Sequence, residues 1–351
     1  MQDYTITTEI ASTPPHLSTK KRINAFDNAR GLLVIFYVVQ SCVGAISGLV
    51  VPTWFGHNWG NVEEGAATFL RMGLLDVGPS AFYFVLGLTC VLAFQSRLKH
   101  MPKKQAYKEH AYRYLTLMGI VAIVYVGQAI FAGAGHLFGA MHAIAVTGAL
   151  VTPFLNMKKW TRLIAAVVIL GLFWIFNEQI IGILTTQDFA LDGGFAICVG
   201  YLGITLLATF LSELYLENIW HYALSLIPLV GLCVYLYFFE TFIEIDSFYV
   251  IMTGFVVTCV IFLIYAVFDK YILKGKPIPI IAALGKSLLL FFFLKTILGL
   301  VISAIVGDAI EGLATSDIRY RAIVWGTAFA SLALLAIMGY IFEKKNIVVK
   351  L

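Results

Sequence analysis

Ten long apolar stretches, separated by short polar segments, form the main pattern of this sequence. They are mostly about 20 residues long and do not alternate between apolar and polar positions, which is typical of helices. A helix satisfies its own backbone hydrogen bonds and can therefore cross lipid. The sequence predicts an all-α, polytopic membrane bundle of about ten transmembrane helices, whose ninth stretch is too long for one straight helix. The stretches cover residues 31–51, 74–94, 114–131, 137–155, 163–183, 195–211, 219–239, 248–268, 278–306 and 322–342.

The composition also indicates a chain that lies mostly in lipid. Hydrophobic residues make up 60% of the sequence and charged residues 13%, whereas soluble domains carry roughly 25% charged residues. A soluble fold of 351 residues could not bury so much apolar surface. We expect one transmembrane domain over residues 23–343, between a disordered cytoplasmic tail at 1–22 and a cytoplasmic tail at 344–351.

The distribution of lysine and arginine predicts how the chain is oriented. Basic residues gather before the first and third stretches, around the loops that precede the fifth and ninth, and after the tenth. The loop at 212–218 is the one loop on this side without Lys or Arg, and the opposite side is mostly acidic. Because cytoplasmic loops are enriched in Lys and Arg, we expect both termini in the cytoplasm. We expect a multi-pass protein of a prokaryotic plasma membrane, with the lipid bilayer as partner and no nucleic acid.

Asp27 and Arg30 open the first stretch and lie three residues apart, which places them on one helical face. In the simpler interpretation, Asp27 favours the helix start and Arg30 anchors the span on the cytoplasmic side. Alternatively, the pair forms a cytoplasmic mouth in which Asp27 orients Arg30 toward a phosphate.

His57 lies between Trp54 and Trp59, in the segment that joins the first two stretches. A histidine between tryptophans is compatible with an ordinary anchor at the outer membrane interface. It also suits a general base, because the unperturbed pKa of histidine lies near working pH.

Four further ionisable residues lie within or beside apolar stretches: Asp76, His142, Glu178 and Lys295. A charge at membrane depth is costly and therefore suggests function. We interpret His142 either as a buried, satisfied histidine or as part of a binding site. Lys295 either faces a polar cavity or extends its ammonium group to the interface.

The sequence contains no Walker loop, dinucleotide fingerprint or nucleophile elbow. Its five cysteines all lie in apolar stretches and show no zinc-binding spacing. We therefore expect no metal cofactor.

Four segments resemble a family of transmembrane acyltransferases, closest to heparan-α-glucosaminide N-acetyltransferase and its bacterial relatives. The first, at 22–33, has a basic residue, an Asp and then Arg-Gly leading into the first stretch. The others are 76–87 with its internal proline, 139–155 with Gly-x-x-His-x-Ile and a final Pro-Phe-Leu, and 285–295 with Gly-x-Ser-Leu. The resemblance covers nearly the whole chain, with a weak middle.

This resemblance implies transfer of an acyl group from cytoplasmic acetyl-CoA, or another acyl-CoA, to a hydroxyl or amine on the outer side. The family's key histidine falls on His57, followed here by Asn58. Two positions depart from the family: Gln40 stands where it usually has Asn or His, and Lys295 where it usually has His.

Our leading hypothesis is a membrane acyltransferase that modifies an extracytoplasmic glycan, alone or as a homodimer. His57, Asn58, Gln40 and Asp76 are the candidate catalytic residues; Asp27, Arg30, Lys295 and His142 are the candidates for binding acyl-CoA. The hypothesis requires a passage through the bundle. The alternatives are a transporter or flippase whose polar path includes Lys295, Asp76 and Glu178, and a membrane scaffold without catalytic activity.

Overall fold

The computed structural model describes residues 23–44, 74–132, 139–184, 194–239, 247–288, 290, 291, 294, 313 and 317–345, and the structural statements below concern these residues. Within them the chain forms ten α-helices and no strand, which confirms the all-α prediction. A 3₁₀ turn, Thr152–Phe154, follows α4, and a π-helical turn, Asp269–Leu273, continues α8. The helices are α1 (Asn24–Gly44), α2 (Leu74–Leu98), α3 (Lys103–Ala132), α4 (Ala140–Leu150), α5 (Lys159–Leu184), α6 (Gly194–Glu217), α7 (Ile219–Phe239), α8 (Ser247–Phe268), α9 (Pro279–Lys286) and α11 (Ile318–Lys344).

Seven of the described helices are long and apolar enough to cross a membrane, which agrees with a polytopic membrane protein. They are α2, α3, α5, α6, α7, α8 and α11. α4 has only 11 residues, and at 1.5 Å per residue it is too short to cross a hydrocarbon core of about 30 Å. Pro153 lies in the 3₁₀ turn that follows α4 and lacks a backbone N–H donor, so the regular helix does not continue there.

The predicted spans differ from the helices mainly at the basic end. α7 matches the predicted 219–239, but α3 begins at Lys103 instead of 114, and α6 continues to Glu217. Charged residues with long side chains are good helix formers, so these helices extend beyond their apolar stretches. The ninth stretch is indeed not one straight helix: α9 ends at Lys286, and Ser287 leaves the helical conformation with φ −121° and ψ 35°.

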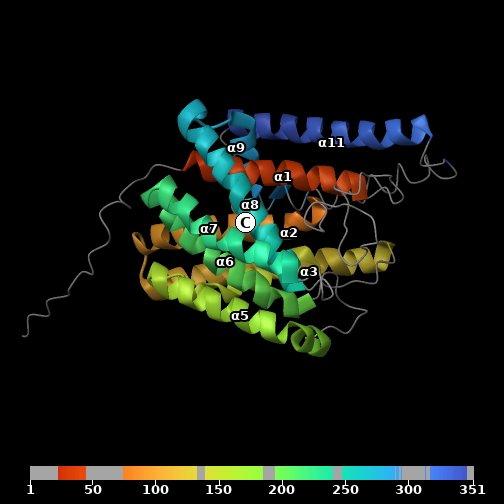
Figure 1. Ribbon diagram of the computed structural model, residues 1–351. Coiled ribbons are helices and arrows are strands. Elements are labelled where there is room, and N and C mark those ends of the chain that lie inside the picture. Colours follow the sequence, from red (N-terminus) through yellow and green to blue (C-terminus); the bar gives the residue numbers. More distant parts are fainter. Residues whose placement is uncertain are drawn as a thin grey trace, which may run out of the picture.

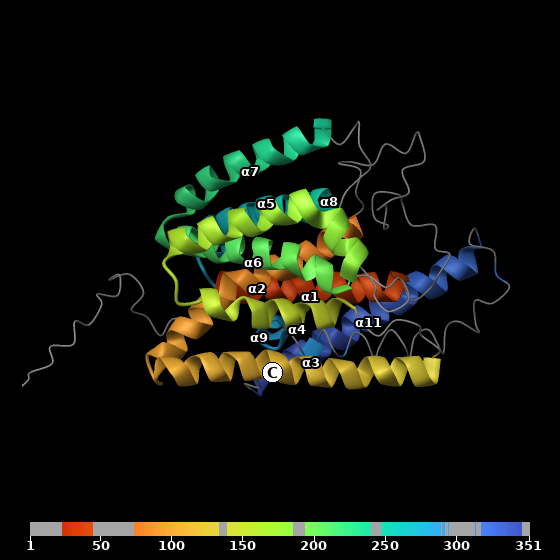
Figure 2. The ribbon, with the colours of Figure 1, turned by 90° about the horizontal axis from the view of Figure 1, so that it is seen from below.

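α6 and α2 occupy the centre of the bundle (Figures 1 and 2). The most apolar window of α6 is 89% buried and that of α2 is 67% buried, compared with 22–28% for α3, α5, α7 and α11. α5 packs on α6, α8 packs on α2, and α1 lies between α2 and the pair formed by α9 and α11. Small residues allow the central contact: a Cβ atom on Gly87 of α2 would overlap with Ala208 of α6.

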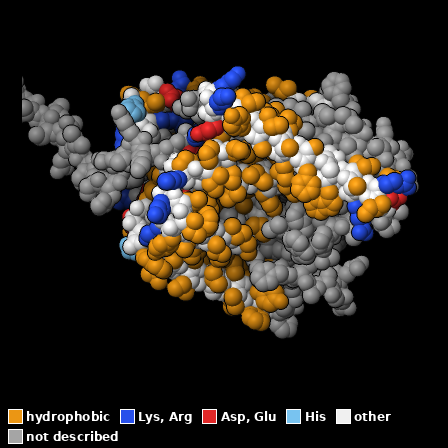
Figure 3. All heavy atoms as spheres, turned by 90° about the horizontal axis from the view of Figure 1, so that it is seen from above, with side chains coloured by type: hydrophobic (Ala, Val, Ile, Leu, Met, Phe, Trp, Pro, Cys, Tyr) orange, Lys and Arg blue, Asp and Glu red, His pale blue; other side chains and the backbone are white. Residues whose placement is uncertain are grey.

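The outer helices present apolar side chains to their surroundings. Ile123, Ile175, Ile227, Ile264 and Phe329 are each 65% or more exposed. One face of the molecule carries a broad band of apolar side chains between two charged ends (Figure 3). An apolar surface of this extent is not typical of a soluble monomer and fits contact with lipid.

The connections from α2 to α3, α4 to α5, α6 to α7 and α8 to α9 lie together at one end of the bundle (Figure 1). We call it the basic end, because these connections and the adjoining helix ends carry Lys99, Lys103, Lys158, Lys159 and Lys274. This arrangement matches the alternation of charge along the sequence.

α1 and α9 contact each other directly through their backbones, at Gly31 and Gly285. A Cβ atom on Gly31 would overlap with the carbonyl oxygen of Ile281, and one on Gly285 would overlap with the carbonyl oxygen of Asp27. Both contacts involve backbone atoms, which cannot rotate away as a side chain can. The close crossing therefore depends on glycine at both positions.

We expect Gly285→Ala to lower the melting temperature of the purified protein in detergent, because the added methyl group forces α1 and α9 apart. Overpacking of this kind costs about 1–3 kcal/mol. Gly326→Ala in α11 is the matched control, since its Cβ would meet nothing within 4 Å. That exchange should be neutral or stabilising by roughly 0.5–1 kcal/mol, the usual gain of alanine over glycine in a helix. An equal response of the two variants would contradict the described crossing.

Candidate functional site

Asp27 and Arg30 meet at the start of α1, as their spacing predicts. Nη1 of Arg30 donates a hydrogen bond to Oδ1 of Asp27 over 3.3 Å. The Asp27 side chain is 4% exposed and that of Arg30 is 24% exposed. The buried carboxylate thus holds a guanidinium group that remains partly accessible at the basic end, an arrangement that suits recognition of a phosphate.

Two of the family-like segments, far apart in the sequence, meet at this point. Gly285 begins the late segment and packs against the carbonyl of Asp27 in the first segment. Lys286 forms an ion pair with Glu343 of α11 over 3.0 Å, which joins a third helix to the pair. The Asp27–Arg30 pair therefore lies on a rigid junction of α1 and α9.

Asn28 also fixes this junction, and the sequence analysis did not single it out. Its side chain is fully buried; Nδ2 donates to the hydroxyl of Tyr265 in α8 over 2.8 Å. Its Oδ1 accepts from the backbone N–H of Ile278, just before α9, over 3.3 Å. An Asn beside the Asp of the first segment is visible in the sequence, but nothing there shows that its partners lie more than 200 residues away.

Arg162 occupies a different environment from the one predicted. The sequence analysis counted it among the basic residues around the loop preceding the fifth span, but its side chain is 1% exposed and forms an ion pair with Glu213 of α6. Lys159 of α5 similarly pairs with Glu217. These partners explain why the loop at 212–218 has no Lys or Arg: the end of α6 supplies the carboxylates that neutralise the start of α5. In the sequence, Glu213 and Glu217 were the sign that the basic residues at the start of α5 have acidic partners.

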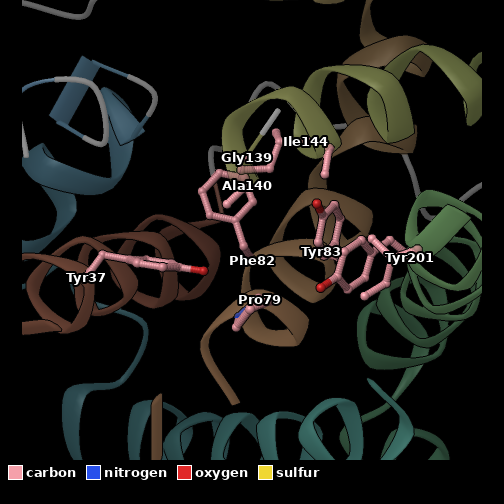
Figure 4. A pocket seen from close by; sticks show the side chains of 10 residues that line it. Tyr37, Pro79, Phe82, Tyr83, Gly139, Ala140, Ile144 and Tyr201 are labelled. Atoms are coloured by element: carbon pink, nitrogen blue, oxygen red, sulfur yellow. The ribbon is translucent and has the colours of Figure 1, made fainter. Parts of the chain in front are cut away.

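A cavity lies between α1, α2, α4 and α6 (Figure 4). The cavity is small: its volume is about 10 Å³, roughly what one water molecule needs. Four of the ten lining residues are aromatic, namely Tyr37, Phe82, Tyr83 and Tyr201, and Pro79 of α2 also lines the cavity. Each residue lies in the half of its helix that is remote from the basic end.

The tyrosines give the cavity polar groups within an apolar wall. The rings of Tyr83 and Tyr201 stack with centroids 3.9 Å apart, and the ring of Tyr37 meets Phe82 edge-on at 6.0 Å. In Figure 4 the Tyr37 side chain extends from α1 toward α2. The cavity thus combines aromatic walls with the hydroxyl-bearing side chains of three tyrosines.

Asp76 lies one turn before the cavity lining on α2. It is 5% exposed and belongs to the first turn of α2, three residues before the cavity-lining Pro79. A helix start favours a carboxylate.

His142 is buried near the start of α4, but on a different face from the cavity lining. Its ring meets Tyr125 of α3 edge-on, with centroids 4.8 Å apart. The cavity is lined instead by Ala140, Ala143 and Ile144 of the same helix. His142 is therefore buried against α3 and does not line this cavity.

The remaining candidates lie partly or wholly outside the described residues. These are His57, Asn58 and Lys295, together with the side chains of Gln40 on α1 and Glu178 on α5. Within the described part of the chain, no group of three or more His, Cys, Asp or Glu side chains could hold a metal ion.

A protein family model matches a large part of the chain. The family model described as the catalytic part of heparan-alpha-glucosaminide N-acetyltransferase matches residues 22–238, more than half of the chain. This range contains α1 to α7, and therefore the Asp27–Arg30 pair, the Arg162–Glu213 pair and the whole cavity lining. No curated protein matches the chain.

We expect Asn28→Ala to destabilise the protein, because it leaves the hydroxyl of Tyr265 and the N–H of Ile278 without their buried partner. The expected cost is about 1–3 kcal/mol, measured as a lower melting temperature in detergent. Asn24→Ala is the matched control, since Asn24 donates an exposed hydrogen bond to the carbonyl of Gly275. A similar loss in both variants would argue against a structural role specific to Asn28.

Proposed function

The chain belongs to the family of heparan-α-glucosaminide N-acetyltransferase catalytic domains, and from this membership we propose that it transfers an acetyl group across a membrane. The donor is cytoplasmic acetyl-CoA and the acceptor is a hydroxyl or amine of an extracytoplasmic glycan. The bundle lies in the plasma membrane of a prokaryotic cell, with the basic end in the cytoplasm.

The position of the cavity relative to Arg30 is the observation that supports this proposal most. Tyr37 of the cavity lining and Arg30 lie seven residues apart on α1, which puts them on the same face of the helix, two turns apart. Two turns correspond to about 10 Å. A donor anchored at Arg30 therefore has to extend along only two turns of α1 to bring its acyl group to the cavity.

Arg30 has the chemistry required to hold the donor. Its guanidinium is always charged and forms paired hydrogen bonds to phosphate oxygens. Asp27 fixes the side chain from the buried side, so less conformational entropy is lost on binding. The donor itself supplies an activated thioester.

His57 is proposed as the general base, with Asn58 or Gln40 stabilising the oxyanion. The acceptor nitrogen or oxygen attacks the thioester carbonyl carbon while His57 takes the acceptor proton. A new C–N or C–O bond forms, the C–S bond breaks, and the proton passes to the departing thiolate. Asp76 is the proposed acidic neighbour that favours the protonated imidazole.

The aromatic lining supports a glycan as acceptor. A sugar ring presents C–H groups on its faces and hydroxyl groups at its edges, and the cavity lining includes the aromatic, hydroxyl-bearing side chains of Tyr37, Tyr83 and Tyr201. An assay with labelled acetyl-CoA and a panel of cell-wall sugars tests the reaction directly. Ion-coupled uptake into vesicles, without acetyl transfer, would favour the transporter alternative with Lys295, Asp76 and Glu178 instead.

We expect His57→Ala to lower the rate of acetyl transfer by about 10²–10⁴-fold, the usual contribution of a positioned general base. The measurement is transfer from labelled acetyl-CoA to a sugar acceptor in detergent or nanodiscs. His221→Ala removes an exposed histidine from the start of α7 and serves as the control. Turnover retained by His57→Ala would exclude His57 as the base.

We expect Arg30→Gln to raise KM for acetyl-CoA by about tenfold or more, since a hydrogen bond to a charged group contributes about 1.5–3 kcal/mol. The value of kcat at saturating donor should change much less, because Arg30 binds a part of the donor remote from the reacting bond. Lys344→Gln at the same end of the bundle is the control for a change of one charge. An unchanged KM would remove Arg30 from the donor site.

A further inference from the structure

Residues 97–113, which run from the end of α2 into the first third of α3, form a strongly basic segment. They carry six Lys or Arg residues and a single acidic residue, Glu109, and these six positive charges and one negative charge leave a net charge of +5 with histidine neutral. A net charge of this size over so short a stretch attracts anionic partners. The proposed acetyl transfer uses none of these residues. The basic ones are Arg97, Lys99, Lys103, Lys104, Lys108 and Arg113.

The basic segment lies where α3 leaves the hydrocarbon core of the membrane. α3 has 30 residues, which correspond to about 45 Å at 1.5 Å per residue, whereas the hydrocarbon core is only about 30 Å thick. The apolar stretch of α3 begins at 114, directly after Arg113. Leu115 and Ile123 in that stretch are 50% and 74% exposed and belong to its lipid-facing surface. Arg113 and the residues before it therefore lie at the depth of the headgroups.

Two pairs of lysine and tyrosine on α3 mark the same depth. The ammonium group of Lys103 lies 6.0 Å from the ring centroid of Tyr107, and that of Lys108 lies 5.5 Å from the centroid of Tyr112. Tyrosine and lysine are typical of the membrane interface. α3 is also a peripheral helix, which packs on α4 and α2 and whose apolar window is only 22% buried (Figure 2). Phospholipids can therefore reach this part of the protein from the side.

Buried neighbours hold the two arginines of the segment. Nη1 of Arg97 lies 3.3 Å from Nδ1 of His110, and because a guanidinium can only donate, Nδ1 is the acceptor. His110 is 1% exposed, and its ring packs on Phe94 of α2 and on Tyr114, with centroids 6.1 and 5.0 Å apart. The guanidinium carbon of Arg113 lies 5.9 Å from the ring centroid of the same Tyr114. One pair of buried rings thus positions an arginine from each helix.

These two arginines lack an acceptor of their own charge type. Nε of Arg113 is buried and has no hydrogen-bond partner among the described residues, and neither Arg97 nor Arg113 forms an ion pair with another of them. Glu109 is exposed and accepts a hydrogen bond from Gln105. A buried donor without an acceptor is costly, so an anion that supplies oxygen atoms would stabilise this pair of arginines.

We propose that Arg97 and Arg113 bind the headgroup of an anionic phospholipid in the leaflet at the basic end. A guanidinium forms paired hydrogen bonds to phosphate oxygens, and clusters of Lys and Arg that adjoin a membrane span favour anionic lipids. A lipid fits better than a soluble anion because its acyl chains can lie along the exposed Leu115 while its phosphate meets Arg113. The proposal does not depend on the proposed acetyl transfer.

Binding of a fluorescently labelled phosphatidylglycerol to the full-length protein in mild detergent, followed by fluorescence anisotropy, tests this proposal. The main variant is Arg97→Gln with Arg113→Gln, which removes both guanidinium groups. Arg113→Gln alone is the second variant, because it leaves the contact between Arg97 and His110 intact and decides the question if the double variant does not fold. Lys344→Gln with Lys345→Gln is the control, since it removes two exposed charges at the end of α11.

We expect the double variant to bind the labelled lipid about tenfold or more weakly than the wild type and the control, and Arg113→Gln alone about threefold or more weakly. Unlabelled phosphatidylglycerol should displace the probe and phosphatidylcholine should not. Variants that keep both the wild-type melting temperature and wild-type binding would overturn the proposal. An equal loss in the control would reduce the effect to net charge and overturn it too. Displacement of the probe by coenzyme A would assign the arginines to a soluble phosphate ligand and likewise overturn it.

Discussion

The backbone contact between α1 and α9 is the constraint on which the basic end of this protein depends. Because Gly31 and Gly285 lack side chains, the two helices approach until carbonyl groups fill the space of the missing Cβ atoms. Asn28 then reaches both Tyr265 and the start of α9. The same approach buries Asp27, and a buried carboxylate fixes the direction of Arg30. The direction of the Arg30 side chain at this end thus depends on close packing between helices as much as on charge.

The architecture was predictable because lipid leaves few choices. An apolar run long enough to cross a bilayer has to be helical, and α7 follows its predicted limits for this reason. The basic ends were less predictable, since Lys and Arg are compatible both with a helix that extends into water and with a loop. α3 accordingly begins 11 residues before its predicted start at 114. The length of the ninth apolar stretch predicted that its helix is interrupted. It did not predict that the interruption lies at Ser287, after α9.

The candidate site was predictable where two residues are neighbours on one helix, as Asp27 and Arg30 are. It was not predictable where the partners come from distant helices. Arg162 resembled a surface anchor in the sequence, because nothing in its local context indicates which face of α5 packs on α6. The aromatic cavity was also missed, since Tyr37, Tyr83 and Tyr201 lie in three separate apolar stretches and become neighbours only in the folded bundle.

The ion pair between Arg162 and Glu213 also bears on how the bundle holds a buried charge. Arg162 lies in the first turn of α5, and its buried charge would be costly without a partner. Arg162 and Glu213 belong to consecutive helices that pack closely against each other. The two charges therefore need only α5 and α6 in order to pair. The α5–α6 hairpin thus contains the counter-charge for its own buried arginine.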